Sequence, residues 1–213
     1  MIKAAFVQPK TVLCLGAHAD DIEIGCGGTL LKLIDQHPEL SVHWVVFSGN
    51  EQRAAEARES AAAFFKDTAE YKINCLSFKD SFFPYQAEAI KETMHELSSS
   101  IVPDLIFTHR ADDAHQDHRL LSELAWCAFR DHAILEYEIP KYEGDLGRPN
   151  LLVELSPQQT ERKLDHLMSA FGSQRSKHWY TRDTFLSLMR LRGLECNSKS
   201  RFAEGFYARK IVI

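Results

Sequence analysis

The chain has 213 residues, of which 45% are hydrophobic, so it is long enough for one well-packed domain and short for two. Its formal net charge of -5 argues against a protein that binds nucleic acid by neutralising phosphates, because such proteins carry a basic surface. No apolar run approaches the roughly 20 residues that a membrane-spanning helix needs. We expect a single domain over residues 1–213, with no nucleic-acid partner and no transmembrane segment.

The cysteines and the first nine residues indicate the cellular compartment of the protein. The five cysteines form no C-x-x-C pair, and several lie in apolar runs, where a free thiol packs as a small hydrophobic group. Residues 1–9 lack a long apolar core followed by a small-residue cleavage site, so no signal peptide is predicted. Both features predict a cytoplasmic protein.

The first predicted strand is the apolar run 11–15, which leads into a histidine and two adjacent aspartates within residues 18–21. A glycine-rich segment, 25–28, follows and is expected to lead into a helix from Thr29, where glycine allows close packing on a sheet. A dinucleotide-binding fingerprint is the alternative for these glycines. It is rejected, because Leu30 stands where a small residue is required and the upstream carboxylates would repel a pyrophosphate.

Strands and helices then alternate along the chain. Such alternation predicts an α/β fold: a Rossmann-like three-layer sandwich with a mostly parallel sheet and helices on both faces. The predicted strands are 41–47, 74–78, 104–108, 134–139, 151–155 and 202–213, and the predicted helices are 51–66, 86–99, 119–128, 157–171 and 181–192.

A second polar cluster follows the predicted strand 104–108. Residues 109–118 contain three histidines and three aspartates, which is more than a solvated loop requires. Ligands of parallel α/β sheets gather beyond the carboxyl ends of the strands. The clusters at 18–21 and 109–118 are therefore expected to converge, provided that their strands lie close together in the sheet.

Histidine and carboxylate ligands in these clusters suit a catalytic metal. A catalytic zinc usually takes three protein ligands and leaves a fourth position for water. His18, Asp21 and His118 would supply that set, which accepts Fe²⁺ as well as Zn²⁺. Asp20 lies beside a ligand but is free of the metal, so it could take a proton from a water molecule whose pKa the metal lowers to about 7.

Hydrolysis of an amide also needs a proton donor for the leaving amine and a group that stabilises the oxyanion. His115 is the candidate for this role, as a cationic group three residues before a predicted ligand. Asp117 is the candidate that orients His115 and favours its protonated form.

The two motifs, His18-Ala19-Asp20-Asp21 and His115-Gln116-Asp117-His118, resemble the paired H-x-D-D and H-x-D-H motifs of the PIG-L/LmbE-like zinc-dependent de-N-acetylases. Further similar stretches are 53–56, 108–113, 173–174 and 202–206. The resemblance implies that His18, Asp21 and His118 bind zinc, that Asp20 is the general base, and that His115 stabilises the transition state. Ala19 departs from the proline of many relatives, which affects loop stiffness but no ligand.

Four other polar residues have competing interpretations. Arg53 is predicted to contact substrate, with a helix-surface ion pair to Glu56 as the alternative. His109 and Asp112 are interpreted as solvated loop residues. Asp113 is interpreted as a carboxylate that supports a metal ligand.

The predicted function is that of a zinc-dependent hydrolase that removes an N-acetyl group from an N-acetylglucosamine-type amino-sugar conjugate, whether free, nucleotide-linked or lipid-linked. The alternatives are a metal-dependent phosphoesterase and a non-catalytic sugar-binding relative. Loops 79–85 and 141–150 are expected to select the group attached to the sugar.

Overall fold

A seven-stranded sheet runs through the computed structural model, which describes residues 8–65 and 70–211. The strand order is β3-β2-β1-β4-β5-β7-β6; the first five pair in parallel, and β7 is antiparallel to both β5 and β6. The strands are β1 (Thr11–Gly16), β2 (Ser41–Ser48), β3 (Glu70–Phe78), β4 (Leu105–His109), β5 (Ala133–Tyr137), β6 (Leu151–Glu154) and β7 (Ala203–Ala208).

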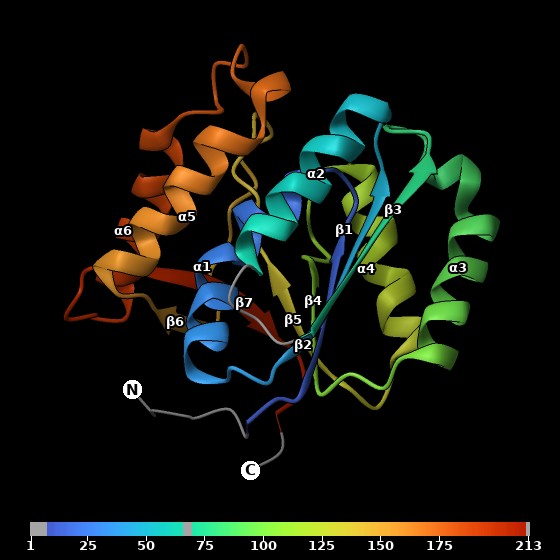
Figure 1. The fold of residues 1–213 in the computed structure, drawn as a ribbon, viewed down its shortest axis with the longest axis horizontal. Helices are drawn as coiled ribbons and strands as arrows, with labels where there is room; N and C mark the ends of the chain where they lie inside the picture. The colour runs from blue at the N-terminus through green and yellow to red at the C-terminus, as the bar shows by residue number, and fades with distance from the viewer. Residues whose placement is uncertain (1–7, 66–69, 212–213) are drawn as a thin grey trace.

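Helices cover both faces of this sheet (Figure 1). Buried residues of α1, α2, α5 and α6 form one hydrophobic cluster with one side of the strands, and those of α3 and α4 form a second cluster with the other side. The predicted α/β three-layer sandwich is therefore confirmed. The helices are α1 (Asp21–Gln36), α2 (Glu51–Phe64), α3 (Ala87–Ser100), α4 (Gln116–Ala128), α5 (Pro157–Ala170) and α6 (Arg182–Glu195), with short 3₁₀ turns η1 (Phe83–Gln86) and η2 (Gly172–Gln174).

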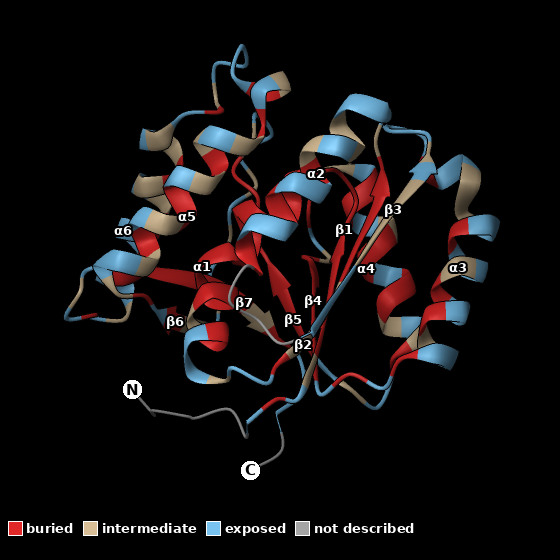
Figure 2. Ribbon diagram, viewed as in Figure 1, coloured by how far each residue is buried: buried red, intermediate tan, exposed pale blue. Residues whose placement is uncertain are grey.

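Strand β1 lies inside the sheet, between β2 and β4, and is buried on both faces (Figure 2). Val12 and Cys14 point into the first cluster, and Leu13 and Leu15 into the second, which explains the uninterrupted apolar run. Because β1 pairs directly with β4, with Cys14 opposite Phe107, the carboxyl ends of these two strands lie side by side. The sheet order thus meets the condition on which the two-cluster prediction depends.

Helix α1 begins at Asp21, eight residues earlier than the sequence predicts. The glycine-rich segment lies inside the helix, where it permits close contact with the sheet. A Cβ atom at Gly25 would lie 2.2 Å from the ring of Tyr137 on β5. Glycine usually weakens a helix, but here the packing that it allows outweighs that preference.

The predicted strand boundaries differ most at β3 and at the last strand, and by one or two residues elsewhere. Strand β3 begins at Glu70 rather than at residue 74, because the first three residues of this edge strand are exposed and charged residues interrupt its apolar ones, so they form no apolar run. The last strand ends at Ala208. The predicted end of a helix at Lys66, the last two residues of the predicted final strand, and residues 1–7 of the segment inspected for a signal peptide lie outside the described residues.

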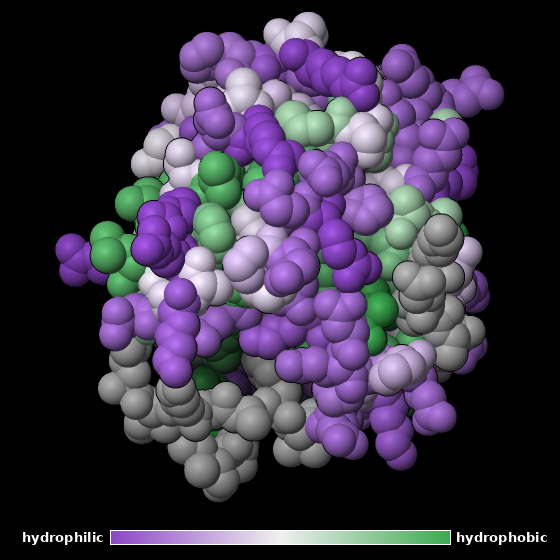
Figure 3. All heavy atoms as spheres, turned by 60° about the vertical axis from the view of Figure 1, so that its left-hand side comes forward, coloured by the Kyte–Doolittle hydropathy of each residue, from purple (hydrophilic) through white to green (hydrophobic). Residues whose placement is uncertain are grey.

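The exterior of the layers is mostly polar. On the face that Figure 3 shows, hydrophilic residues predominate and hydrophobic ones are scattered between them. Among the described residues, none of the helices has the length and apolar character needed to cross a bilayer.

Candidate metal centre

The two predicted clusters meet at the carboxyl edge of β1 and β4. Residues 17–20 connect β1 to α1, whose first residue is Asp21, and His115 is the N-cap of α4. The backbone N–H of Ala17 donates to His109 Nε2 over 2.9 Å, which joins the two strand ends directly.

The three predicted ligands form a compact triangle of donor atoms. His18 Nδ1 lies 3.1 Å from His118 Nε2 and 3.3 Å from Asp21 Oδ2, and His118 Nε2 lies 3.5 Å from the same oxygen. A tetrahedral zinc with bonds of about 2.0–2.2 Å requires its ligand atoms to be about 3.3–3.6 Å apart. All three side chains are buried. The donor set therefore fits zinc in type and number, and two of the three distances lie within the required range, while the distance between the two histidine nitrogens is about 0.2 Å shorter.

The protonation states of these three side chains also favour the binding of a cation. Burial would raise the pKa of Asp21, but His118, His109 and His18 hold it well below the usual value. Burial and the neighbouring His109 lower the pKa of His118 to about 3, which leaves this imidazole neutral, as metal binding requires. Burial also acts to lower the pKa of His18, yet the surrounding carboxylates raise it well above its usual value, so this pocket favours an added positive charge.

Carboxylates face the far nitrogens of both histidines. His118 Nδ1 lies 3.1 Å from Asp113 Oδ2, as predicted for a supporting carboxylate, and Lys141 Nζ lies 2.9 Å from that oxygen. His18 Nε2 lies 3.3 Å from Asp117 Oδ2 and 3.2 Å from Asp80 Oδ1. Such contacts fix the ring orientation and raise the basicity of a ligating histidine.

The predicted contact by which the Asp117 carboxylate would orient the His115 ring is not seen. The Asp117 carboxylate accepts hydrogen bonds from the backbone N–H groups of Ser81 (2.6 Å) and Phe83 (3.1 Å) and lies against His18. Its backbone N–H, not its carboxylate, reaches His115 Nδ1. The Asp117 charge acts to raise the pKa of His115, as predicted, but burial and the nearby His18 outweigh it and lower that pKa, so the neutral form is favoured. Asp117 orients His18 and the loop after β3.

Asp20 is buried beside the triangle, and Arg53 is its partner. Arg53 Nη2 donates to Asp20 Oδ1 over 2.8 Å, and Arg53 Nη1 lies 3.5 Å from Asp80 Oδ2. The alternative ion pair to Glu56 is wrong, because the Glu56 carboxylate accepts bonds from the N–H and hydroxyl of Ser173. Burial raises the pKa of Asp20, and the Arg53 charge partly opposes that effect.

Two residues that lie at the site, His109 and Asp80, were not predicted from the sequence as site residues. His109 is fully buried rather than solvated: its Nε2 lies 3.2 Å from Asp21 Oδ2, and its ring stacks on that of His118 with centroids 3.8 Å apart. Its position as the last residue of β4 was the available signal. Asp80, two residues after the end of β3, carries the same kind of signal. Asp112 is exposed, as predicted.

Comparisons with known proteins agree with this geometry. The family model described as PIG-L: GlcNAc-PI de-N-acetylase matches residues 13–129, more than half of the chain. The chain is 27% identical over 139 residues to the uncharacterized deacetylase YaiS of Escherichia coli strain K12, covering 62% of this chain and 75% of the relative. It is 28% identical over 134 residues to a diacetylchitobiose deacetylase of Thermococcus kodakarensis, covering 55% of this chain and only 48%, about half, of that relative.

Solved structures share the fold. The N,N'-diacetylchitobiose deacetylase of Pyrococcus horikoshii matches with a TM-score of 0.70 and 24% identity, over 94% of this chain and 84% of that one. The 4-carboxy-2-hydroxymuconate hydratase GalB of Pseudomonas putida KT2440 matches with a TM-score of 0.76 and 16% identity, over 96% and 98%. Because one fold carries both named activities, these structures support the architecture, and function has to be argued from the site.

Proposed function

The chain belongs to the PIG-L family of GlcNAc-PI de-N-acetylases, and from this premise we propose that it hydrolyses the N-acetyl group of an N-acetylglucosamine-type amino-sugar conjugate. The observation that carries the proposal is the triangle of His18, Asp21 and His118 donor atoms with the buried carboxylate of Asp20 beside it. The two curated relatives, which are named as deacetylases, give independent support.

His18, Asp21 and His118 would hold the metal, with Zn²⁺ as the best fit to the donor spacing and Fe²⁺ as a second ion that such a set accepts. A metal bound there lowers the pKa of a water molecule and polarises the acetyl carbonyl. Asp113 and Asp117 hold the two imidazoles in the orientation in which one ring nitrogen of each faces the triangle.

Asp20 is the proposed general base. Burial raises its pKa, which increases its affinity for a proton above that of an exposed aspartate. The ion pair with Arg53 acts against the effect of burial, favouring the ionised carboxylate, and holds Asp20 Oδ1 at 2.8 Å from the guanidinium. Asp20 would take a proton from the attacking water and return it to the sugar nitrogen as the C–N bond breaks, giving acetate and the free amine.

His115 is the proposed hydrogen-bond donor to the developing oxyanion. Its Nδ1 accepts the backbone N–H of Asp117, so the proton of the neutral ring resides on Nε2. The neutral imidazole can therefore donate one hydrogen bond without first becoming cationic. Its ring lies 4.9 Å from that of His18 and 4.6 Å from that of His118, measured between centroids.

Acetate release is the test. Purified protein is stripped with a chelator, reloaded with zinc and incubated with N-acetylglucosamine and its conjugates; we expect acetate from the loaded protein alone. Asp20→Asn should lower the rate by about 10²–10⁴-fold, while Asp112→Asn, an exposed aspartate near the same site, should not. Hydrolysis of phosphate monoesters without acetate release would replace the proposal with the phosphoesterase alternative, and sugar binding without turnover would support the non-catalytic one.

A further inference from the structure

A groove of about 430 Å³ lies along one face of α4, and its lining residues are distinct from those of the metal centre. On α4 the groove is lined by Arg119, Glu123 and Trp126, which recur every three or four residues and therefore share one side of the helix. Arg130, just after the end of α4, and Arg209, just after the end of β7, complete the lining used in this argument. The groove bounded by these five residues is called the basic groove below.

Arg209 is anchored in the basic groove by the buried carboxylate of Glu136 on β5. Arg209 Nη2 lies 2.6 Å from Glu136 Oε1, and the indole N–H of Trp126 donates to the same oxygen over 2.6 Å. Glu136 Oε2 accepts the backbone N–H of Ala111 over 2.9 Å. The Arg209 guanidinium rests against the Trp126 ring, 4.5 Å from its centroid. The position of this cation is therefore set before any ligand binds.

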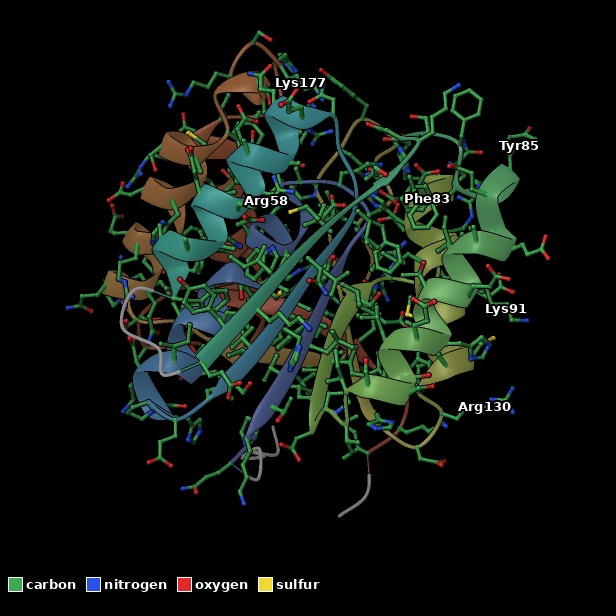
Figure 4. The ribbon with its side chains drawn as sticks, turned by 45° about the vertical axis from the view of Figure 1, so that its right-hand side comes forward. Arg58, Phe83, Tyr85, Lys91, Arg130 and Lys177 are labelled. Carbon is green, nitrogen blue, oxygen red and sulfur yellow. The ribbon has the colours of Figure 1, made fainter. Side chains whose placement is uncertain are left out.

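The other two guanidinium groups are bonded through one nitrogen each. Arg119 Nη1 donates to the carbonyls of Asp113 (2.9 Å) and Ala114 (2.5 Å), and Arg130 Nε donates to the carbonyl of Cys127 (3.2 Å). A guanidinium carries five N–H groups, so among the contacts of residues 8–65 and 70–211 each arginine of the groove keeps donors for a ligand. Figure 4 shows Arg130 projecting outward at the edge of the molecule.

The basic groove has an excess of positive charge, although the chain has a formal net charge of -5. Its cations are the three arginines and the ammonium of Lys210, which lies 5.4 Å from the centroid of the Trp126 ring; its carboxylates are Glu123 and the buried Glu136. Guanidinium groups bind phosphate oxygens in pairs, a geometry that an ammonium lacks.

We propose that the basic groove binds a phosphate-bearing small molecule, at a site separate from the metal centre. Its volume of about 430 Å³ lies within the range of small-molecule sites, about 300–1,000 Å³. An acidic peptide fits less well, because peptide and protein partners rely on apolar or aromatic anchors, and the Trp126 ring is already in contact with Arg209 and Lys210. The inference does not depend on the proposed function, because the two sites share no residue.

Calorimetric titration of the full-length chain with inorganic pyrophosphate tests the proposal; the metal-free protein is used, because pyrophosphate removes zinc. We expect one saturable site. Arg130→Gln should weaken binding by about 5- to 10-fold, the loss expected when a charged hydrogen-bond donor is removed. Arg58→Gln, the same change at an exposed arginine of α2 (Figure 4), is the matched control and should change the affinity by less than about twofold.

Glu123→Gln is a second variant with the opposite expected effect. It removes a carboxylate that repels the ligand, so it should tighten pyrophosphate binding by about 2- to 5-fold. A gain of affinity cannot result from misfolding. Titration of the zinc-loaded protein with inorganic phosphate, which leaves zinc bound, should show the same dependence on Arg130.

Four results would overturn the site. They are no saturable binding of pyrophosphate, unchanged affinity in both Arg130→Gln and Glu123→Gln, an equal loss in Arg58→Gln and Arg130→Gln, and tighter Arg130-dependent binding of a hexaglutamate peptide than of pyrophosphate. The second result would place the anion elsewhere on the protein, and the third would show that overall charge attracts it. Acetate release by the zinc-loaded protein tests the proposed function separately.

Discussion

Asp117→Asn is a sharp perturbation, because one carboxylate holds both the loop after β3 and the ring of His18. Its Oδ2 accepts the N–H of Ser81 and faces His18 Nε2, and its Oδ1 accepts the N–H of Phe83. An asparagine has the same size but only one acceptor oxygen. Whichever way the amide turns, a backbone N–H that now bonds to a carboxylate would face an NH₂ group.

A hydrogen bond to a charged acceptor contributes about 1.5–3 kcal/mol, so Asp117→Asn should lower the free energy of unfolding by about 2–3 kcal/mol. The substitution also weakens the contact that orients the His18 ring. Because His18 is a proposed metal ligand, the zinc affinity of the protein should fall by about 10- to 100-fold. Urea unfolding of the metal-free protein measures the first effect, and competition with a chromogenic chelator measures the second.

Asp112→Asn is the control for this prediction, since Asp112 is an exposed aspartate close to the same site. It should change the free energy of unfolding by less than about 0.5 kcal/mol and leave zinc affinity unchanged. The reasoning about Asp117 fails if Asp117→Asn matches this control in both measurements.

Two further predictions concern the core. Lys163→Met removes the cation from a buried ion pair with the Glu204 carboxylate of β7, at 2.6 Å, and should lower the free energy of unfolding in urea by about 3–5 kcal/mol. The control Lys91→Met, on the exposed side of α3 (Figure 4), should have little effect, and equal effects of the two substitutions would contradict the ion-pair argument. Gly25→Ala forces a methyl group against the ring of Tyr137 on β5 and should lower the free energy of unfolding by about 1–3 kcal/mol. Gly172→Ala, whose Cβ would meet its nearest atom at 3.7 Å, should leave the stability unchanged. A Gly25→Ala protein as stable as the unmodified protein would refute the close approach of α1 to the sheet.

The layers of the fold can be predicted from the sequence, because the patterns that indicate strands and helices are local. Buried parallel strands appear as apolar runs, and the H-x-D-D and H-x-D-H motifs follow two of them. The start of α1 could not be predicted, because the value of glycine at position 25 depends on the ring of Tyr137, more than 100 residues away in the chain. A strand-end histidine such as His109 looks like a loop residue until the neighbouring strand is known.

The partners within the site could not be predicted for a related reason. Asp20 meets Arg53 and Asp117 meets Ser81 across separations of 33 and 36 residues, and the second contact depends on the left-handed conformation of Ser81. Sequence spacing placed Asp117 next to His115, but the α4 N-terminus turns the carboxylate toward the loop instead. Motif spacing can indicate which residues gather, whereas their pairing depends on loop geometry.

The central claim is that His18, Asp21 and His118 hold one catalytic metal. Anomalous diffraction at the zinc edge from crystals of the zinc-loaded protein tests it most directly. We predict a single strong peak bounded by His18 Nδ1, Asp21 Oδ2 and His118 Nε2, whose mutual distances are 3.1–3.5 Å. No peak, or a peak on the opposite side of His18 between Asp80 and Asp117, which also lie within ligand distance of one another, would contradict the account.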